Sequence, residues 1–326
     1  MTENTINVGA ESTTSQYRVL SLDGGGAKGL YTLGVLHEFE KYVGGSLGSY
    51  FELIYGTSTG AIIAALLALG KSVAEILDIY LELVPRVMRA GLRPPPLARR
   101  YRSNALRREA ERIFGDRNFD AFQTALGLVA VDYDGAKPMI FKTKADLAIG
   151  RRSSFEAGFG STIVDALVAS TAAFPFFARP RIATSSWGNP EVLDGGYAAN
   201  NPTMLAIADA LRVVTAPERL AVLSIGVGHY KEPKRSIAHQ LLFSMWWFYM
   251  IPKTLETSTN TMEGLRKALC AHVPCVRIDE TYAGSEYATD LLESDRNKLE
   301  KLFVLGRTSF GAFESQVKQL FPPLAN

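Results

Sequence analysis

The chain is 326 residues long, 47% hydrophobic and 21% charged, which is typical of a globular protein with a large buried core. Its formal net charge of +2 is too small to indicate a general DNA- or RNA-binding surface. Only two cysteines are present, so we expect no disulfide framework and a cytoplasmic location. Residues 1–16 lack the features of a secretory signal. We therefore expect a flexible tail over 1–16, one folded domain over 17–320 and a short tail over 321–326.

Two strand–glycine-loop–helix units begin the chain. Tyr17–Leu22 is a β-rich run that ends at a cluster of glycines, and apolar residues with helical spacing follow over Leu30–Tyr42. Phe51–Tyr55 repeats the pattern, leading through Gly56–Gly60 into the apolar Ala61–Leu69. Two such units predict an α/β fold of three layers, with a mostly parallel sheet covered by helices on both faces.

The remaining elements extend this fold. Leu126–Tyr133 and Met139–Lys142 flank an Asp-Gly turn, which predicts an antiparallel hairpin. Leu220–Val227 has the continuous apolar character of a buried central strand. From Ala238 onward the pattern is mainly helical, and Thr289–Gln319 is the longest stretch.

The sequence from Gly56 to Gly60, GTSTG, has the form of a nucleophile elbow, G-x-S-x-G. It lies between a predicted strand and a predicted helix, as that motif requires. The glycines permit a strained turn, and the start of the helix places positive dipole character beside the serine oxygen. Ser58 is therefore a candidate nucleophile, although such a pentapeptide can also form an ordinary turn.

An earlier loop, Gly24–Gly29, has the pattern G-x-G-x-x-G after a strand. That pattern alone could indicate a nucleotide-binding module without catalytic activity. The next predicted strand, however, ends in the serine elbow and not in the acidic residue that holds a ribose. Gly24, Gly25 and Gly26 fit a different task, which is to present N–H groups to a negatively charged oxygen. Lys28 would add positive charge nearby.

Two residues compete for the role of the base. His229 follows a predicted strand, and the order Ser58, Asp194, His229 is that of an α/β-hydrolase triad acting on small esters. Asp194–Gly196, DGG, places an aspartate between an apolar run and two glycines, ahead of a helix that begins near Pro202. The residues alone leave open whether Asp194 is the base, orients His229 or only organises its turn.

Together, the motifs DGGGAKG, GTSTG and DGG resemble the patatin-like phospholipase family. The resemblance implies a Ser–Asp dyad that works without a catalytic histidine. Ser58 would be the nucleophile, Asp194 the proton acceptor, and Gly24 to Gly26 the oxyanion hole, with Lys28 where arginine is common. It also implies hydrolysis of membrane phospholipids to fatty acids and lysophospholipids, without a metal or other cofactor.

Longer segments, including VLSLDGGGAKGLYTLGVL, GTSTGAIIAALLALG and LDGGYAANNPT, resemble one branch of that family. This branch comprises the cyclic GMP-AMP-activated phospholipase effectors of bacterial CBASS antiphage defence. The resemblance implies 3′,3′-cyclic GMP-AMP as allosteric activator and a partner nucleotidyltransferase that makes it. It further implies action at the inner membrane surface and a homodimer or larger oligomer on activation.

An arginine-rich segment runs from Arg86 to Arg117, with ten arginines, three acidic residues and no lysine. Guanidinium groups suit the phosphates of lipid headgroups or of a cyclic dinucleotide. A solvated helix face would explain the same charges. The candidates for phosphate or cyclic dinucleotide contacts are Arg86, Arg89, Arg99, Arg100 and Tyr101.

Two further features carry less information. Leu241–Pro252 is rich in Trp and other apolar residues but shorter than the ~20 residues of a membrane-spanning helix. It suits either a core helix or an interfacial element. Cys270, His272 and Cys275 do not have the spacing of a common zinc site, so no metal is predicted there.

Overall fold

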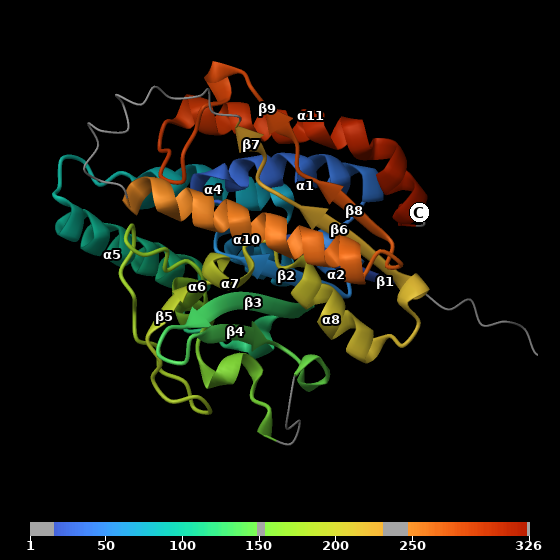
Figure 1. Ribbon diagram of the computed structural model, residues 1–326, viewed down its shortest axis with the longest axis horizontal. Coiled ribbons are helices and arrows are strands. Elements are labelled where there is room, and N and C mark those ends of the chain that lie inside the picture. The colour runs from blue at the N-terminus through green and yellow to red at the C-terminus, as the bar shows by residue number, and fades with distance from the viewer. Residues whose placement is uncertain (1–15, 149–153, 231–246, 325–326) are drawn as a thin grey trace, which may run out of the picture.

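The computed structural model describes residues 16–148, 154–230 and 247–324, and a mostly parallel sheet lies at its centre (Figure 1). The strand order within these residues is β4-β3-β2-β1-β6-β8, and β5 is an additional partner of β3. β4 and β5 run antiparallel to β3, while the other neighbouring strands are parallel. The strands are β1 (Tyr17–Leu22), β2 (Leu53–Thr57), β3 (Ala125–Asp132), β4 (Lys137–Lys142), β5 (Val192–Asp194), β6 (Leu220–Ile225) and β8 (Cys275–Ile278). A separate parallel pair consists of β7 (His229–Tyr230) and β9 (Thr281–Tyr282).

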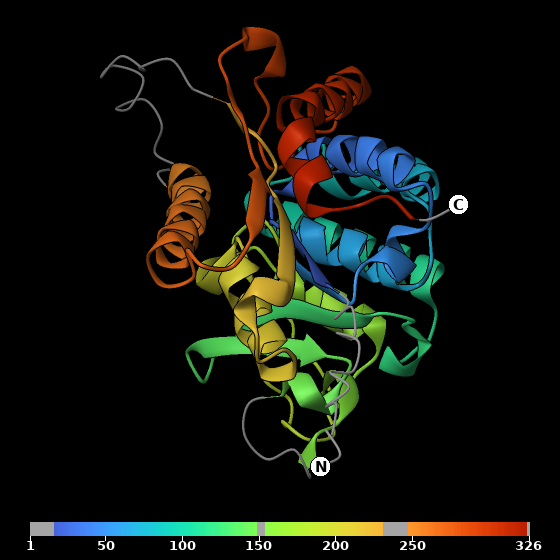
Figure 2. The ribbon, with the colours of Figure 1, turned by 90° about the vertical axis from the view of Figure 1, so that its right-hand side faces the viewer.

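Helices cover both faces of the sheet. The helices are α1 (Gly29–Val43), α2 (Leu47–Tyr50), α3 (Thr59–Ala68), α4 (Val73–Met88), α5 (Pro95–Phe114), α6 (Ile163–Ser170), α7 (Gly196–Ala199), α8 (Thr203–Val213), α10 (Trp247–Leu269) and α11 (Arg296–Leu320). Figure 2 shows α8 and α10 on one side of the sheet and α1 and α11 on the other. The predicted three-layer α/β/α architecture is confirmed.

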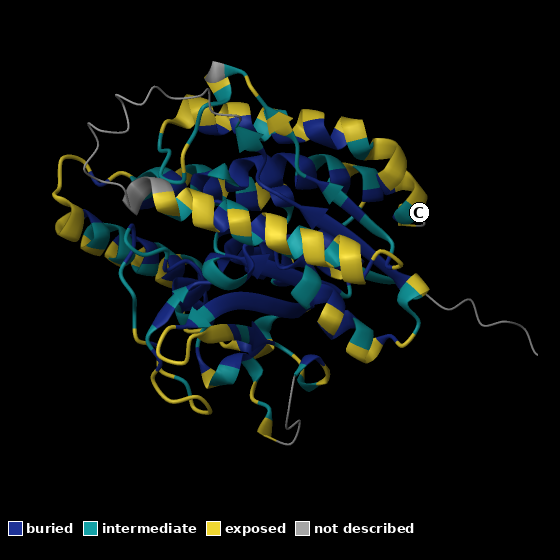
Figure 3. Ribbon diagram, in the orientation of Figure 1, coloured by how far each residue is buried: buried dark blue, intermediate teal, exposed yellow. Residues whose placement is uncertain are grey.

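Alternating side chains of the strands build two hydrophobic cores. In β1, Leu20 and Leu22 belong to the larger core, which also contains buried residues of α1, α3, α4 and α11. Val19 points the other way, into a smaller core with residues of α8. This alternation follows from the two-residue period of a strand. Figure 3 shows that the central strands β1, β2, β3 and β6 are mostly buried, whereas the outer faces of α10 and α11 are exposed.

Several predicted elements are confirmed and one region is corrected. β1, β2, β6 and the antiparallel β3–β4 hairpin are present. α11 confirms the longest predicted helix, but it begins at Arg296 and not at Thr289. The prediction of a mainly helical region after Ala238 is wrong for Cys275–Ile278, which forms β8 and pairs with β6. Val276 and Ile278 are buried in the larger core, so strand pairing and packing determine this short segment.

The predicted C-terminal tail also needs correction, because its first residues are part of the core. Phe321 is fully buried and its ring lies against those of Phe39 and Phe51. The Tyr50 hydroxyl donates a hydrogen bond of 2.7 Å to the carbonyl oxygen of Pro322. The packed part of the chain therefore continues past Leu320. The predicted N-terminal tail lies outside the described residues, apart from residue 16.

The apolar segment predicted over Leu241–Pro252 is described only in part. Residues 241–246 lie outside the described ranges, and the following residues begin α10, where Met250 is 40% exposed. Among the described residues, no helix is both long enough and apolar enough to cross a membrane.

Candidate active site

The register of the sheet brings the ends of β2 and β5 together. Thr57, the last residue of β2, pairs with Val129 of β3. Asp194, the last residue of β5, pairs with the next residue of β3, Ala130. Because β2 is parallel to β3 and β5 is antiparallel, the two strands point at each other along one edge of β3. Ser58, which follows Thr57, consequently faces Asp194.

The serine lies on a strained turn that only close-packed glycines allow. Ser58 has φ 53° and ψ −119°, in a region that non-glycine residues rarely adopt. A Cβ atom at Gly56 would lie 2.4 Å from the carbonyl oxygen of Gly60. A Cβ atom at Gly60 would lie 2.4 Å from the carbonyl oxygen of Leu22. β2 and α3 thus meet tightly at the serine, which is at the N-terminal end of the buried α3 and its dipole.

Ser170 ties the serine turn to the aspartate loop. Its Oγ accepts a 3.0 Å hydrogen bond from the backbone N–H of Ser58 and donates one of 2.6 Å to the carbonyl oxygen of Val129. The carbonyl oxygen of Ser170 accepts from the N–H of Gly195. Ser170 is fully buried at the end of α6. No motif in the sequence indicated this role.

The carboxyl group of Asp194 is poised to exchange a proton near neutral pH. Asp194 is 1% exposed, and this burial raises the pKa of its carboxyl group to about 7. Hydrogen bonds from the Ser58 side chain and from the Gly196 N–H, the latter 2.7 Å long, oppose the rise in pKa. A serine hydroxyl that donates to such a carboxylate can be activated as a nucleophile.

The glycine loop presents two N–H groups beside the serine. The Gly24 N–H donates to the carbonyl oxygen of Asn200 over 3.0 Å. In the described part of the chain, by contrast, the N–H groups of Gly25 and Gly26 have no protein acceptor. Gly25 and Gly26 line the same pocket as the serine, and Thr59 Oγ1 holds the loop by donating to the carbonyl oxygen of Gly26 over 2.8 Å. Such N–H groups can stabilise a tetrahedral oxyanion.

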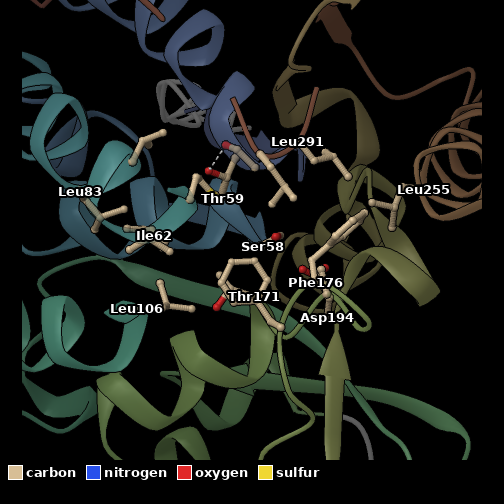
Figure 4. A pocket seen from close by; sticks show the side chains of 18 of the residues that line it. Ser58, Thr59, Ile62, Leu83, Leu106, Thr171, Phe176, Asp194, Leu255 and Leu291 are labelled. Atoms are coloured by element: carbon tan, nitrogen blue, oxygen red, sulfur yellow. Dashed lines mark hydrogen bonds between the residues drawn. The ribbon is translucent and has the colours of Figure 1, made fainter. Parts of the chain in front are cut away.

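A mostly apolar pocket leads to the serine. Figure 4 shows Ser58 near its centre and Asp194 beside it, with Leu255 and Leu291 on the opposite side from α3 and α4. The pocket is lined on the α3, α4 and α5 side by Ile62, Leu83, Val84, Val87, Met88 and Leu106. These side chains can bury a hydrocarbon chain next to the serine hydroxyl.

Asn200 is a further site residue that the sequence motifs did not single out. Its Nδ2 donates to the carbonyl oxygen of Gly24 over 3.1 Å and to Thr259 Oγ1 over 2.8 Å. Its Oδ1 is buried without a hydrogen-bond partner, and the residue lines the serine pocket. Asn200 therefore fixes the glycine loop and leaves an acceptor at the site.

His229, the alternative base, is held away from the serine pocket. Its Nε2 lies 3.0 Å from Asp279 Oδ2, and that hydrogen bond raises the pKa of the imidazole. Arg277 bridges Asp279 and Asp23 with two contacts of 2.6 Å. The four side chains form a network that ends at Asp23, directly before the glycine loop. The histidine is thus part of an ion-pair network, and it is not among the residues that line the pocket of Ser58.

A second, more polar groove lies on the other side of the glycine loop. Its residues include Gly24, Lys28, His229, Tyr230 and Lys253. Lys28 thus faces this groove and is close enough to lower the pKa of His229 through its charge. The serine pocket does not include Lys28 among its lining residues.

The arginine candidates lie on α4, α5 and the loop between them. Arg86 forms ion pairs with Glu82 at 3.3 Å and Glu109 at 3.4 Å. Arg99 lies over the ring of Phe174 at 5.2 Å. Arg89 and Arg100 are exposed. The ring of Tyr101 is stacked against the guanidinium group of Arg93, whose Cζ lies 4.3 Å from the ring centroid. None of the five lines the serine pocket.

A family model described as patatin-like phospholipase matches residues 20–207, and the chain belongs to this family of hydrolases. It is 43% identical over 322 residues to a cUMP-AMP-activated phospholipase of Escherichia coli, a match that covers 97% of this chain and 99% of the other. It is 31% identical over 221 residues to a cGAMP-activated phospholipase of Vibrio cholerae, covering 62% of this chain and 60% of the other. A cGAMP-activated phospholipase of Pseudomonas aeruginosa is 30% identical, with 64% and 62% covered. The predicted family is confirmed.

Proposed function

We propose that the chain hydrolyses acyl ester bonds of membrane phospholipids with a dyad of Ser58 and Asp194. The observation that carries this proposal is the position of Ser58 beside the buried carboxyl group of Asp194 at the end of an apolar pocket. A histidine is not needed, because a carboxylate whose pKa is near 7 can itself take the serine proton. His229 serves another purpose, in its network with Asp279.

The reaction proceeds in two steps. Ser58 Oγ attacks the ester carbonyl carbon while Asp194 accepts its proton, and the ester bond breaks as Asp194 returns that proton to the leaving lysophospholipid oxygen. Water then attacks the acyl-serine while Asp194 accepts its proton. The bond between the acyl carbon and Ser58 Oγ breaks, Asp194 returns the proton to Oγ, and the fatty acid leaves. These steps require no metal or organic cofactor.

The negative oxygen of each tetrahedral intermediate is stabilised by the N–H groups of Gly25 and Gly26. Gly24, which was predicted with them, contributes differently because its N–H already donates to Asn200. A Cβ atom at Gly24 would lie 2.4 Å from Asn200 Oδ1, so glycine is required there for close approach. Lys28, on the groove side of the loop, adds positive charge near the headgroup end of the substrate.

We further propose that a cyclic dinucleotide activates the enzyme. The predicted activator was 3′,3′-cyclic GMP-AMP, and the relatives in Vibrio and Pseudomonas carry that activation in their names. The relative matched over 97% of this chain is instead named for cUMP-AMP. We therefore propose cyclic UMP-AMP as the preferred activator and cyclic GMP-AMP as a weaker one. A partner nucleotidyltransferase would supply the activator in antiphage defence, and the activated enzyme would assemble and act at the inner membrane surface.

Replacing either member of the dyad tests the chemistry. Ser58→Ala removes the nucleophile, and Asp194→Asn keeps the shape but removes the base. Each should lower kcat for phospholipid hydrolysis by on the order of 10³ or more, because the two groups act as one unit. The measurement is the release of fatty acid from phospholipid vesicles in the presence of the activator.

His229→Ala is the matched control, since it removes the rival base. At saturating activator it should keep kcat within roughly tenfold, because its imidazole does not line the pocket of Ser58. The dyad is wrong if Asp194→Asn remains active or if His229→Ala loses as much activity as Ser58→Ala.

A further inference from the structure

The turn between α4 and α5 carries the most exposed large apolar side chain of the described residues. Leu92 is 105% exposed and Leu97 is 57% exposed, on either side of three consecutive prolines. We define the α4–α5 tip as residues 89–100; it lies at the left edge of the molecule in Figure 1. Two leucines in open solvent are unfavourable for a surface that contacts only water.

The tip is a built turn that holds these leucines outward. Gly91 has φ 62°, a left-handed conformation that favours glycine. Arg93 donates to the carbonyl oxygen of Ala90 over 2.7 Å and stacks on the ring of Tyr101. Arg102 Nε donates to the carbonyl oxygen of Met88 over 3.1 Å, joining the two helices below the turn. Proline at the start of α5 further restricts the backbone.

Two exposed arginines at the tip lack acidic partners among the described residues, whereas three arginines below it have them. No acidic residue occurs from Leu83 to Arg108. Within the described ranges, Arg89 and Arg100 are exposed and form no ion pair. Farther down the same helices Arg86, Arg107 and Arg112 form ion pairs, for example Arg107 with Asp165 at 2.9 Å. The tip therefore combines free guanidinium groups with exposed leucines.

We propose that the α4–α5 tip is the surface that docks the protein on anionic phospholipid bilayers. Guanidinium groups bind lipid phosphates while leucines enter the acyl boundary, and a bilayer offers both environments at one depth. A free nucleotide would suit the arginines but would leave Leu92 and Leu97 in water. The inference rests on the proposed phospholipase function, whose substrate is such a bilayer.

The α4–α5 tip also lies next to residues that line the pocket of Ser58. Met88, the residue before Arg89, lines the pocket, as do Val87 on α4 and Leu106 on α5. A lipid beside the docked tip therefore meets the helices that line the way to Ser58. Docking at this position brings substrate and pocket together without a membrane-spanning element.

Binding to vesicles tests the proposal with the full chain. We would use the Ser58→Ala background, so that the lipid is not consumed, and vesicles of phosphatidylcholine with or without phosphatidylglycerol. Co-sedimentation would be measured with and without cyclic UMP-AMP. The Leu92→Ser/Leu97→Ser variant should bind anionic vesicles at least tenfold more weakly, and Arg89→Gln/Arg100→Gln roughly tenfold more weakly.

Matched controls separate docking from general surface effects. Leu269→Ser changes another leucine, 63% exposed at the end of α10, and Arg108→Gln changes an exposed arginine lower on α5. Both should bind vesicles like the parent protein. Thermal unfolding confirms that all variants are folded.

The outcomes are distinct. The proposal is overturned if the parent protein binds no anionic vesicle with or without activator, or if the tip variants bind like the controls. If the Arg89→Gln/Arg100→Gln variant lost cyclic dinucleotide binding in calorimetry but still bound vesicles, the arginines would belong to a nucleotide site. That outcome would also overturn the proposal. Because vesicle binding is measured without catalysis, failure of the Ser58–Asp194 chemistry would appear separately, in ester hydrolysis by the wild-type enzyme.

Discussion

In the proposed dyad Asp194 is the base, and its burial raises the pKa of its carboxyl group to about 7. The base must be ionised to accept the serine proton, so kcat/KM should fall about tenfold per pH unit below pH 7 and level off above it. The pH profile of hydrolysis of a small ester in the wild-type enzyme tests this expectation. A rate that stays constant down to pH 5 would contradict it.

His229 must be separated from Asp194 in this profile, because Asp279 raises the pKa of the imidazole above its usual value of 6.5. His229→Ala removes the imidazole and leaves Asp194 in place. If the midpoint near pH 7 belongs to Asp194, it persists in this variant. Disappearance of the midpoint would assign it to the histidine.

The same carboxyl group affects folding stability. Its pKa is about 7 in the folded protein and roughly 3.9 when unfolded, so the folded state binds more protons between these values. Stability is therefore lost as the pH rises through this window. Asp194→Asn should be more stable than wild type at pH 8, by up to about 4 kcal/mol, and show no such gain at pH 4. Urea unfolding at both pH values gives the answer, and an equal difference at both would refute the linkage.

Single residues could be predicted only where a local motif marks them. Ser58 and Asp194 each lie in a short pattern with a known structural context, and the register on β3 brings them together as the patterns suggest. Ser170, whose Oγ accepts a hydrogen bond from the Ser58 N–H, is 112 residues away from Ser58 in the sequence. Asn200, which donates to the carbonyl oxygen of Gly24, is 176 residues away from Gly24. Contacts between such distant positions depend on tertiary packing, which no local spacing encodes.

Helices α1 and α11 pack closely through two glycines. A Cβ atom at Gly34 would lie 2.1 Å from the carbonyl oxygen of Phe303, and one at Gly306 would lie 2.0 Å from that of Tyr31. Gly306→Ala should therefore push the helices apart and lower the free energy of unfolding by about 1–3 kcal/mol. Gly311→Ala is the control in the same helix, because a Cβ atom there meets nothing within 4 Å. It should raise stability by up to about 1 kcal/mol. Equal effects in urea unfolding would disprove this packing.

Whole elements were predictable where their period was long or their turn chemistry clear. The 25 residues of α11 show the helical spacing throughout, and an Asp-Gly turn marks the β3–β4 hairpin. β8 has only four residues, too few for a period, and it is a strand because β6 provides a partner. β5 is likewise too short for a period to be recognised, because it has only three residues, the last of which is Asp194.

On the scale of the whole molecule, the sheet has a switch point between β1 and β6. From β1 the chain builds outward through β2 and β3, and it later returns to add β6 on the other side. In open α/β sheets, ligands bind beyond the carboxyl ends of the strands at such a point. Here that position holds both the glycine loop and the polar groove, and the network from His229 to Asp23 connects the groove with the loop.

We expect activation to act through that groove. A ligand that binds there can bias the glycine loop through Asp279, Arg277 and Asp23, and it activates only if it binds the active arrangement more tightly than the resting one. A shift from about 1% to about 99% active enzyme requires about 5.5 kcal/mol of differential affinity. We expect weak phospholipase activity without ligand, strong activation by cyclic UMP-AMP, less by cyclic GMP-AMP, and none by linear dinucleotides. Calorimetry on Ser58→Ala should show the same order of affinity. Equal hydrolysis with and without cyclic dinucleotide would exclude the switch and leave the dyad untouched.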